Sequence, residues 1–294
     1  MTMKRFQFSQ LIMMIWISLF CLFCLIPFVM VISGSLSTEA DIAKHGYTLV
    51  PLHPNLTAYR MLFLGAERII DGYKISIFVT IVGTVLAVIV NYLGAYAMAR
   101  RTLKYRNALS IFALLTLMFN GGLVPWYIIC VNYLHLKDTV WALILPPLAQ
   151  GFNLFLIRNF LQSIPEELFE SSKIDGASEW RIMLQIIAPL AKPVLATISL
   201  FVALNYWNDW FLGLMFVDNQ KLQPLQLMLR TIVSNVEFLK SSTNSAEMQR
   251  VSATLPTEGV KMAVTVITIG PIIFLYPFLQ KYFVKGLMVG AVKG

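Results

Sequence analysis

The side chains best able to do chemistry gather in one polar stretch, residues 163–181, between long apolar runs. It reads Ser-Ile-Pro-Glu-Glu-Leu-Phe-Glu-Ser-Ser-Lys-Ile-Asp-Gly-Ala-Ser-Glu-Trp-Arg. Carboxylates can serve in acid–base catalysis, but an enzyme site would also need a nucleophile, a base or metal ligands beside them. No such constellation accompanies them, so the stretch favours docking over catalysis.

The same stretch carries local signals for two short helices. Ser163 and Glu166 have the spacing of a capping box, and Pro165 is tolerated in a first helical turn. The helix should stop at Gly176, where the chain can turn with positive φ, and Ser178 can cap a second helix. The spacing therefore predicts a helix pair joined by a sharp bend.

Two interpretations of this bend stay open from the pattern alone. Leu168, Ile174 and Trp180 provide apolar surface, whereas Glu170 and Asp175 provide charge. Such a protruding helix pair could dock in a groove of another protein. It could also be an amphipathic connector that rests on lipid headgroups.

Composition indicates that lipid surrounds the elements that position this stretch. The chain has 294 residues, of which 57% are hydrophobic and 13% charged, and its mean hydropathy is +0.71. Soluble domains carry about 25% charged residues. A membrane helix needs about 20 apolar residues. Six such runs are expected, over residues 11–32, 75–99, 108–131, 139–157, 186–206 and 260–279.

The expected fold is an all-α membrane protein with six transmembrane helices in a single transmembrane domain, residues 1–294. The polar segment 158–185 forms a cytoplasmic helix pair between the fourth and fifth helices. Asn120-Gly121-Gly122 and Pro125 mark a break near the far end of the third helix. The first run is longer than the apolar core of a secretory signal, so we interpret it as a retained helix.

The charge distribution predicts the orientation. If the N-terminus is cytoplasmic, thirteen of the 23 Lys and Arg residues and five of the 15 Asp and Glu residues lie inside. The whole net charge of +8 then falls on the cytoplasmic side, as the positive-inside bias requires. This accounts for the basic composition without nucleic acid. We expect both termini to be cytoplasmic.

Metal and redox chemistry are not expected. Cys21 and Cys24 lie one turn apart inside an apolar run without a second pair, which indicates packing residues. His45, His53 and His135 are distributed over separate outer loops. No metal site is predicted.

The spacing of the polar stretch resembles the signature of ABC-importer permeases. That signature is Glu-Ala-Ala, three residues, Gly, nine residues, Ile, one residue and Leu-Pro. Here Glu170-Ser171-Ser172 is followed at the same spacings by Gly176, Ile186 and Ala188-Pro189. Two serines replace alanines, and Ala188 replaces leucine. The resemblance is to the carbohydrate branch, and to its smaller, maltose-type subunit in size.

Other segments support that branch. Residues 94–100, 207–211 and 281–286 resemble it, and the tail 286–294 looks similar to importers of complex or acidic oligosaccharides, including alginate. The resemblance implies that one set of residues couples this chain to an ATPase: Glu170, Ser171, Ser172, Asp175, Gly176, Ala177, Ile186 and Pro189. It implies a polar contact from Glu170, the bend at Gly176 and a stiff junction at Pro189.

The resemblance also implies the partners. The chain has no Gly-x-x-x-x-Gly-Lys-Ser/Thr phosphate loop, so ATP and Mg²⁺ are expected in two separate ATPase subunits and no cofactor in this chain. A second permease, a different chain in maltose-type systems, and an external solute-binding protein complete the expected importer. This subunit is expected to be non-catalytic.

Candidate substrate contacts have two interpretations. Tyr206, Trp207, Asn208, Asp209 and Trp210 form the densest set of groups that could stack on and hydrogen-bond a sugar, or they form an interfacial aromatic belt with a helix cap. Asn91 and Asn120 could line the path or bond between helices.

The alternative function is an ion-coupled secondary transporter or a channel. Ion coupling usually places charged residues inside the membrane. The interiors of the second, third, fourth and sixth predicted helices have none, which weakens that alternative.

Overall fold

Residues 8–64, 66–241 and 257–269 are the part of the chain that the computed structural model describes. All regular elements in these ranges are helices, and none is a strand. The chain divides into two compact units, residues 1–66 with 229–271 and residues 67–228 with 272–294. The all-α class predicted from the sequence is confirmed.

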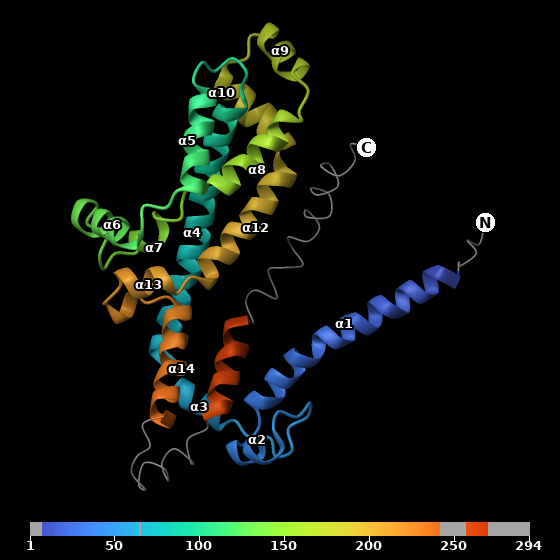
Figure 1. Ribbon diagram of the computed structural model, residues 1–294, viewed down its shortest axis with the longest axis vertical. Helices are drawn as coiled ribbons and strands as arrows, with labels where there is room; N and C mark the ends of the chain where they lie inside the picture. Colours follow the sequence, from blue (N-terminus) through green and yellow to red (C-terminus); the bar gives the residue numbers. More distant parts are fainter. Residues whose placement is uncertain (1–7, 65, 242–256, 270–294) are drawn as a thin grey trace. The chain divides into compact units, whose positions relative to one another are not determined.

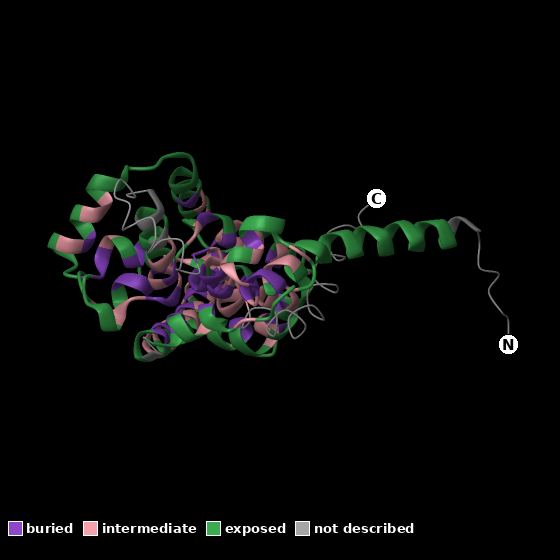
Figure 2. Ribbon diagram, turned by 90° about the horizontal axis from the view of Figure 1, so that it is seen from below, coloured by how far each residue is buried: buried purple, intermediate pink, exposed green. Residues whose placement is uncertain are grey.

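The first unit contains one long apolar helix and several shorter helices. Its elements are α1 (Phe8–Ser35), α2 (Glu39–His45), α3 (Thr57–Phe63), most of α14 (Leu225–Ser241) and a helix over residues 257–269. The 28 residues of α1 rise about 42 Å, which exceeds the ~30 Å of a bilayer core. Figure 2 shows α1 exposed along most of its length. Because its side chains are apolar, α1 suits a lipid environment.

The second unit is built on α4 (Ala66–Ala99), a helix of 34 residues that begins before the predicted start at residue 75. The other elements are α5 (Arg106–Met118), α6 (Leu123–Ile128), η1 (Ile129–Tyr133), α7 (Trp141–Ile144), α8 (Gly151–Gln162), α9 (Glu167–Ile174), α10 (Glu179–Arg181), η2 (Ile182–Ile187), α11 (Ala188–Leu190), α12 (Lys192–Asn208), α13 (Phe211–Phe216) and η3 (Gln220–Leu222).

Three predicted spans are broken in the structure. The third, 108–131, crosses a bend of 115° between residues 106–118 and 123–133, and the fifth, 186–206, crosses a bend of 78° at Ala191. The fourth, 139–157, comprises α7, a non-helical stretch over residues 145–150, and α8. The break in the third run lies at Asn120-Gly121-Gly122, as the sequence predicts. Prolines in the fourth and fifth runs remove backbone donors and disfavour helix in the preceding residue, so apolar length alone predicted too much continuous helix there.

The number of spans stays a prediction. Among the described residues, two unbroken helices are long and apolar enough to cross a membrane, residues 10–35 and 67–99. The two bent pairs raise that number to four if each pair is one span. The sixth predicted span, 260–279, lies partly outside the described residues.

The non-helical stretch before α8 is stabilised by one buried amide on α4. The Asn91 Nδ2 donates to the Leu148 carbonyl at 2.9 Å, and the Asn91 Oδ1 accepts from the Gln150 amide at 3.2 Å. Both backbone groups belong to the break between α7 and α8, where helix bonds are missing. Since a buried unpaired backbone group is costly, Asn91 allows the break to lie inside the unit.

A close approach of α12 to α4 contributes to the same core. The Tyr206 ring lies against Gly83 so tightly that a Cβ there would be 2.6 Å from the ring. The Tyr206 hydroxyl donates to the Ile144 carbonyl at 2.8 Å. Only glycine at position 83 leaves room for this ring, so α4, α7 and α12 pack at one point.

Candidate functional site

The polar stretch singled out in the sequence forms a bent helix pair, which we call the elbow (residues 166–181). It comprises α9 and α10 and lies at one end of the second unit (Figure 1). Gly176 has φ of +77° and its amide donates to the Lys173 carbonyl at 3.0 Å, while the Ala177 amide donates to the Ser172 carbonyl at 3.0 Å. These two bonds are a Schellman ending, and they place the bend where the sequence predicts it.

The second helix begins as expected, but the first does not. The Ser178 hydroxyl accepts from the Arg181 amide at 3.4 Å and caps α10. The capping box predicted for α9 is wrong. The Ser163 hydroxyl donates instead to the Phe160 carbonyl at 2.7 Å, because α8 continues to Gln162 and turns Ser163 into its C-terminal cap.

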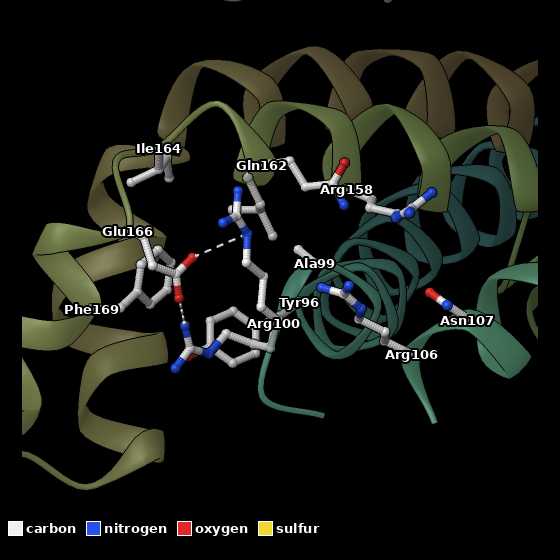
Figure 3. Close-up of a pocket in the computed structure, with 12 residues that line it drawn as sticks. Tyr96, Ala99, Arg100, Arg106, Asn107, Arg158, Gln162, Ile164, Glu166 and Phe169 are labelled. Atoms are coloured by element: carbon white, nitrogen blue, oxygen red, sulfur yellow. Dashed lines mark hydrogen bonds and ion pairs between the residues drawn. The ribbon is translucent and has the colours of Figure 1, made fainter. Parts of the chain in front are cut away.

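The elbow is fastened to the end of α4 by one buried guanidinium. Arg100, only 5% exposed, donates from Nε to Glu179 Oε1 at 2.6 Å and from Nη1 to Glu166 Oε1 at 3.3 Å. Its Cζ lies 4.3 Å from the centre of the Phe169 ring, within cation–π range. Arg100 therefore contacts the elbow on both sides of the bend, and Figure 3 shows it against Glu166 and Phe169.

Two tyrosines extend this attachment along α4. The Tyr96 hydroxyl donates to Glu179 Oε1 at 2.8 Å, and the Tyr92 hydroxyl donates to the Met183 carbonyl at 2.6 Å. Residues 92, 96 and 100 are four apart and so share one helix face. The sequence interpretation missed this Tyr-x-x-x-Tyr-x-x-x-Arg pattern, which was the available signal for a polar seam.

The outer surface of the elbow remains open to a partner. Ile174 is 86% exposed and Trp180 67% exposed, while Glu170 and Asp175 also face solvent. Exposed large apolar side chains grouped with charges are typical of interaction sites. The arrangement therefore offers a rigid, amphipathic docking surface.

The remaining predicted coupling residues divide between the elbow and the helix that follows. Ser171 is exposed, whereas Ser172 is buried and its hydroxyl donates to the Leu168 carbonyl at 2.6 Å. Ile186 lies half-buried in η2, and Pro189 is exposed in α11 next to the 78° bend. Their roles in coupling stay predictions.

The structure keeps the candidate substrate residues away from the elbow. Residues 206–210 form the junction of α12 and α13, where Tyr206 and Trp207 are buried. The Asp209 carboxylate accepts from the Leu212 amide at 3.0 Å, and the Asn208 amide donates to the Leu204 carbonyl at 2.8 Å. Trp210 packs edge-on against Phe211. A role in a substrate path stays a prediction for all five.

Asn91 and Asn120, considered together in the sequence, have different environments. Asn91 is fully buried, as described above. Asn120 is exposed in the break between α5 and α6 and accepts from the Gly122 amide at 2.9 Å. The described residues contain no cluster of His, Cys, Asp and Glu able to hold a metal ion.

Residues 3–289 match the family described as binding-protein-dependent transport system inner membrane component. The chain belongs to this family. As an inner membrane component of such a system, it is a transport permease subunit, and the ABC-importer resemblance in the elbow is confirmed. The comparisons give no support to the ion-coupled transporter or the channel.

Two relatives from one organism are similar to nearly the whole chain. Protein LplC of Bacillus subtilis (strain 168) is 42% identical over 272 residues, 92% of this chain and 90% of that protein. The polygalacturonan/rhamnogalacturonan transport system permease protein YtcP of the same organism is 37% identical over 294 residues, 99% of this chain and all of that protein.

A solved structure supports the fold of this inner membrane component. It is the crystal structure of a bacterial ABC transporter involved in the import of the acidic polysaccharide alginate. The similarity has a TM-score of 0.79 at 27% sequence identity and covers 96% of this chain and 99% of that one.

Proposed function

We infer that the chain is one of two membrane-spanning subunits of an ATP-driven importer of an oligosaccharide. It would lie in the bacterial cytoplasmic membrane, with both termini and the elbow on the cytoplasmic side. The observation that carries this proposal is the elbow, whose exposed Ile174 and Trp180 stand on a bend that Arg100 ties to α4. The positive-inside charge distribution supports the orientation.

Coupling then proceeds through this chain without catalysis by it. Two separate ATPase subunits bind ATP and Mg²⁺, and a groove on one of them holds the elbow, with Glu170 as a polar contact. When that groove moves, the elbow moves as a unit, because Arg100 contacts both of its helices. The Tyr92–Tyr96–Arg100 face transmits the motion to α4, and η2 with Pro189 in α11 transmits it to α12.

The family and the relatives support the proposed partners and cargo. A second, different permease completes the path, and an external binding protein delivers the substrate. The permease YtcP is named for polygalacturonan/rhamnogalacturonan transport, and the solved neighbour imports the acidic polysaccharide alginate. An acidic oligosaccharide is therefore the substrate class we propose.

Binding of the ATPase can be tested with two matched serine substitutions. Ile174 on the elbow and Leu64 outside it are both 86% exposed, so neither substitution should disturb folding. We expect Ile174→Ser to weaken copurification of the ATPase about tenfold, since an apolar side chain lost from an interface removes about 1.5–3 kcal/mol. Leu64→Ser should leave copurification unchanged. Full copurification with Ile174→Ser would contradict the docking role.

Substrate class needs a separate assay. The importer, reconstituted with its ATPases and binding protein, should take up acidic oligosaccharides when ATP is supplied and neutral ones poorly. Uptake without ATP, driven by a proton or sodium gradient, would overturn the proposed mechanism.

A further inference from the structure

A cavity of about 490 Å³ lies where the ends of α4 and α8 meet the start of α5, beside the elbow. Four arginines and a single carboxylate are among the residues that line it: Arg100, Arg101, Arg106, Arg158 and Glu166. The amides of Asn107 and Gln162 complete the polar lining. Such a cavity is chemically complementary to an anion.

The carboxylate neutralises only one side of the cavity. Glu166 is 3.3 Å from Arg100 Nη1 and 3.8 Å from Arg101 Nε. Figure 3 shows Arg106 and Arg158 on the side away from Glu166. Within the described parts of the chain, neither Arg106 nor Arg158 has a carboxylate within ion-pair distance. Two guanidinium groups therefore line the cavity without a counter-ion from residues 8–64, 66–241 or 257–269.

One of these groups also has an unmet hydrogen bond. The Arg158 Nε is buried and has no acceptor among the described residues. The Arg158 Cζ lies 5.7 Å from the centre of the Phe155 ring, a contact that supplies no acceptor oxygen. Buried donors are nearly always paired in folded proteins, so this atom indicates an acceptor that the described residues do not supply.

The helices α5 and α8, which both line the cavity, also expose apolar side chains. One to two turns after Arg106, α5 exposes Leu109 and Phe112, and at the start of α8 Phe152 is exposed as well. The two helices pack together near Gly151, where a Cβ would be 2.7 Å from the Leu117 side chain. A basic cavity at the ends of helices with exposed apolar side chains matches a phosphate headgroup with acyl chains attached.

We propose that this cavity binds the phosphate of an anionic membrane lipid, with Arg106 and Arg158 as the principal phosphate ligands. The guanidinium fork of each arginine can donate two hydrogen bonds to phosphate oxygens. Because Arg100 lines the same cavity and holds the elbow, a bound lipid lies against the attachment between α4 and the elbow.

The test uses the complete importer in nanodiscs of phosphatidylcholine, with or without phosphatidylglycerol. The lipid that stays bound to the importer after extensive delipidation is quantified by mass spectrometry. We expect the wild-type importer to retain phosphatidylglycerol selectively. The Arg158→Gln importer should bind phosphatidylglycerol about fivefold more weakly, as expected for the loss of one juxtamembrane cation. Arg106→Gln should behave in the same way, which keeps the test valid if one variant folds poorly.

Lys104→Gln is the matched control. It removes the same charge from an exposed neighbouring site that does not line the cavity, and it should change retention less than twofold. Equal losses in Lys104→Gln and Arg158→Gln would indicate general surface attraction and overturn the site. Absence of any preference for phosphatidylglycerol over phosphatidylcholine would overturn it as well.

Free inorganic phosphate is the alternative ligand, because it offers the same oxygens to the arginines of the cavity. Inorganic phosphate is added to one sample, and chloride at equal ionic strength is added to a control. The phosphate should fail to displace phosphatidylglycerol, because it lacks the acyl chains. Complete displacement at millimolar phosphate would assign the cavity to a soluble phosphate and overturn the lipid as its occupant.

Discussion

Arg100 Nε donates to Glu179 Oε1 at 2.6 Å, and this bond joins two segments that are 79 residues apart in the chain. It brings the end of α4 against the second helix of the elbow. Since Arg100 is almost fully buried while both of its acidic partners stay partly exposed, the bond anchors a surface element to the interior.

Replacing Arg100 should loosen the elbow. Arg100→Gln removes a charge-assisted pair and is expected to cost about 2 kcal/mol of stability, measured by thermal unfolding of the purified importer. ATP hydrolysis should then proceed with reduced uptake. Arg101→Gln is the control, because Arg101 is 75% exposed and 3.8 Å from Glu166; its effect should stay within about 0.5 kcal/mol. Equal effects of the two would refute the anchoring role.

The bend at Gly176 should depend on backbone conformation alone. At φ of +77° a β-branched residue is strained by about 1–2 kcal/mol, yet the space around a Cβ is empty. We expect Gly176→Val to abolish most uptake while membrane abundance is retained. Gly176→Asn, which tolerates positive φ, should preserve uptake. Wild-type uptake by Gly176→Val would show that the bend is dispensable.

The two asparagines should differ in their contribution to stability. Asn91→Leu leaves the Leu148 carbonyl and the Gln150 amide unpaired, so it should cost about 2–4 kcal/mol. Asn120→Leu removes one exposed local bond and should cost under about 1 kcal/mol. Thermal unfolding in detergent measures both, and similar values for the two would contradict a structural role for Asn91.

Asp138 predicts a pH dependence in the loop between η1 and α7. Backbone hydrogen bonds from Asn219 and Asp218 lower the pKa of its carboxyl, and Lys137 lowers it further. A folded-state pKa below the unfolded value stabilises the protein fully above the unfolded pKa of about 3.9, and this contribution disappears as the pH falls through the folded value.

Wild type should therefore lose thermal stability more steeply than Asp138→Asn as the pH falls below about 4. The variant keeps an acceptor oxygen but has no proton to gain. Parallel pH profiles for the two proteins would exclude this contribution.

Several features of the site could be predicted because their causes are local. The bend needs only a residue that accepts positive φ at Gly176, and the start of α10 needs only a hydroxyl at Ser178. These rules act over a few residues, so the pattern in the sequence was sufficient. The capping box at Ser163 failed because the true end of α8 depends on how that helix packs.

The break inside the predicted span 139–157 has a related reason. Apolar length indicates where lipid can surround a chain, but a break inside an apolar run is tolerated only if another element pairs the freed backbone groups. Asn91 does this for the stretch between α7 and α8. Nothing near residues 145–150 in the sequence points to a partner on α4.

By itself, the sequence determined the membrane class, the family signature and the position of the bend, because composition and short-range backbone rules fix these. Only the tertiary structure decided what holds the elbow and which arginines are left without a counter-ion. Arg100 and Arg158 look alike in sequence as basic residues at the ends of apolar runs, and both line the cavity. Among the described residues, however, only Arg100 of these two is paired with a carboxylate. That difference depends on which distant side chains folding brings within a few ångströms.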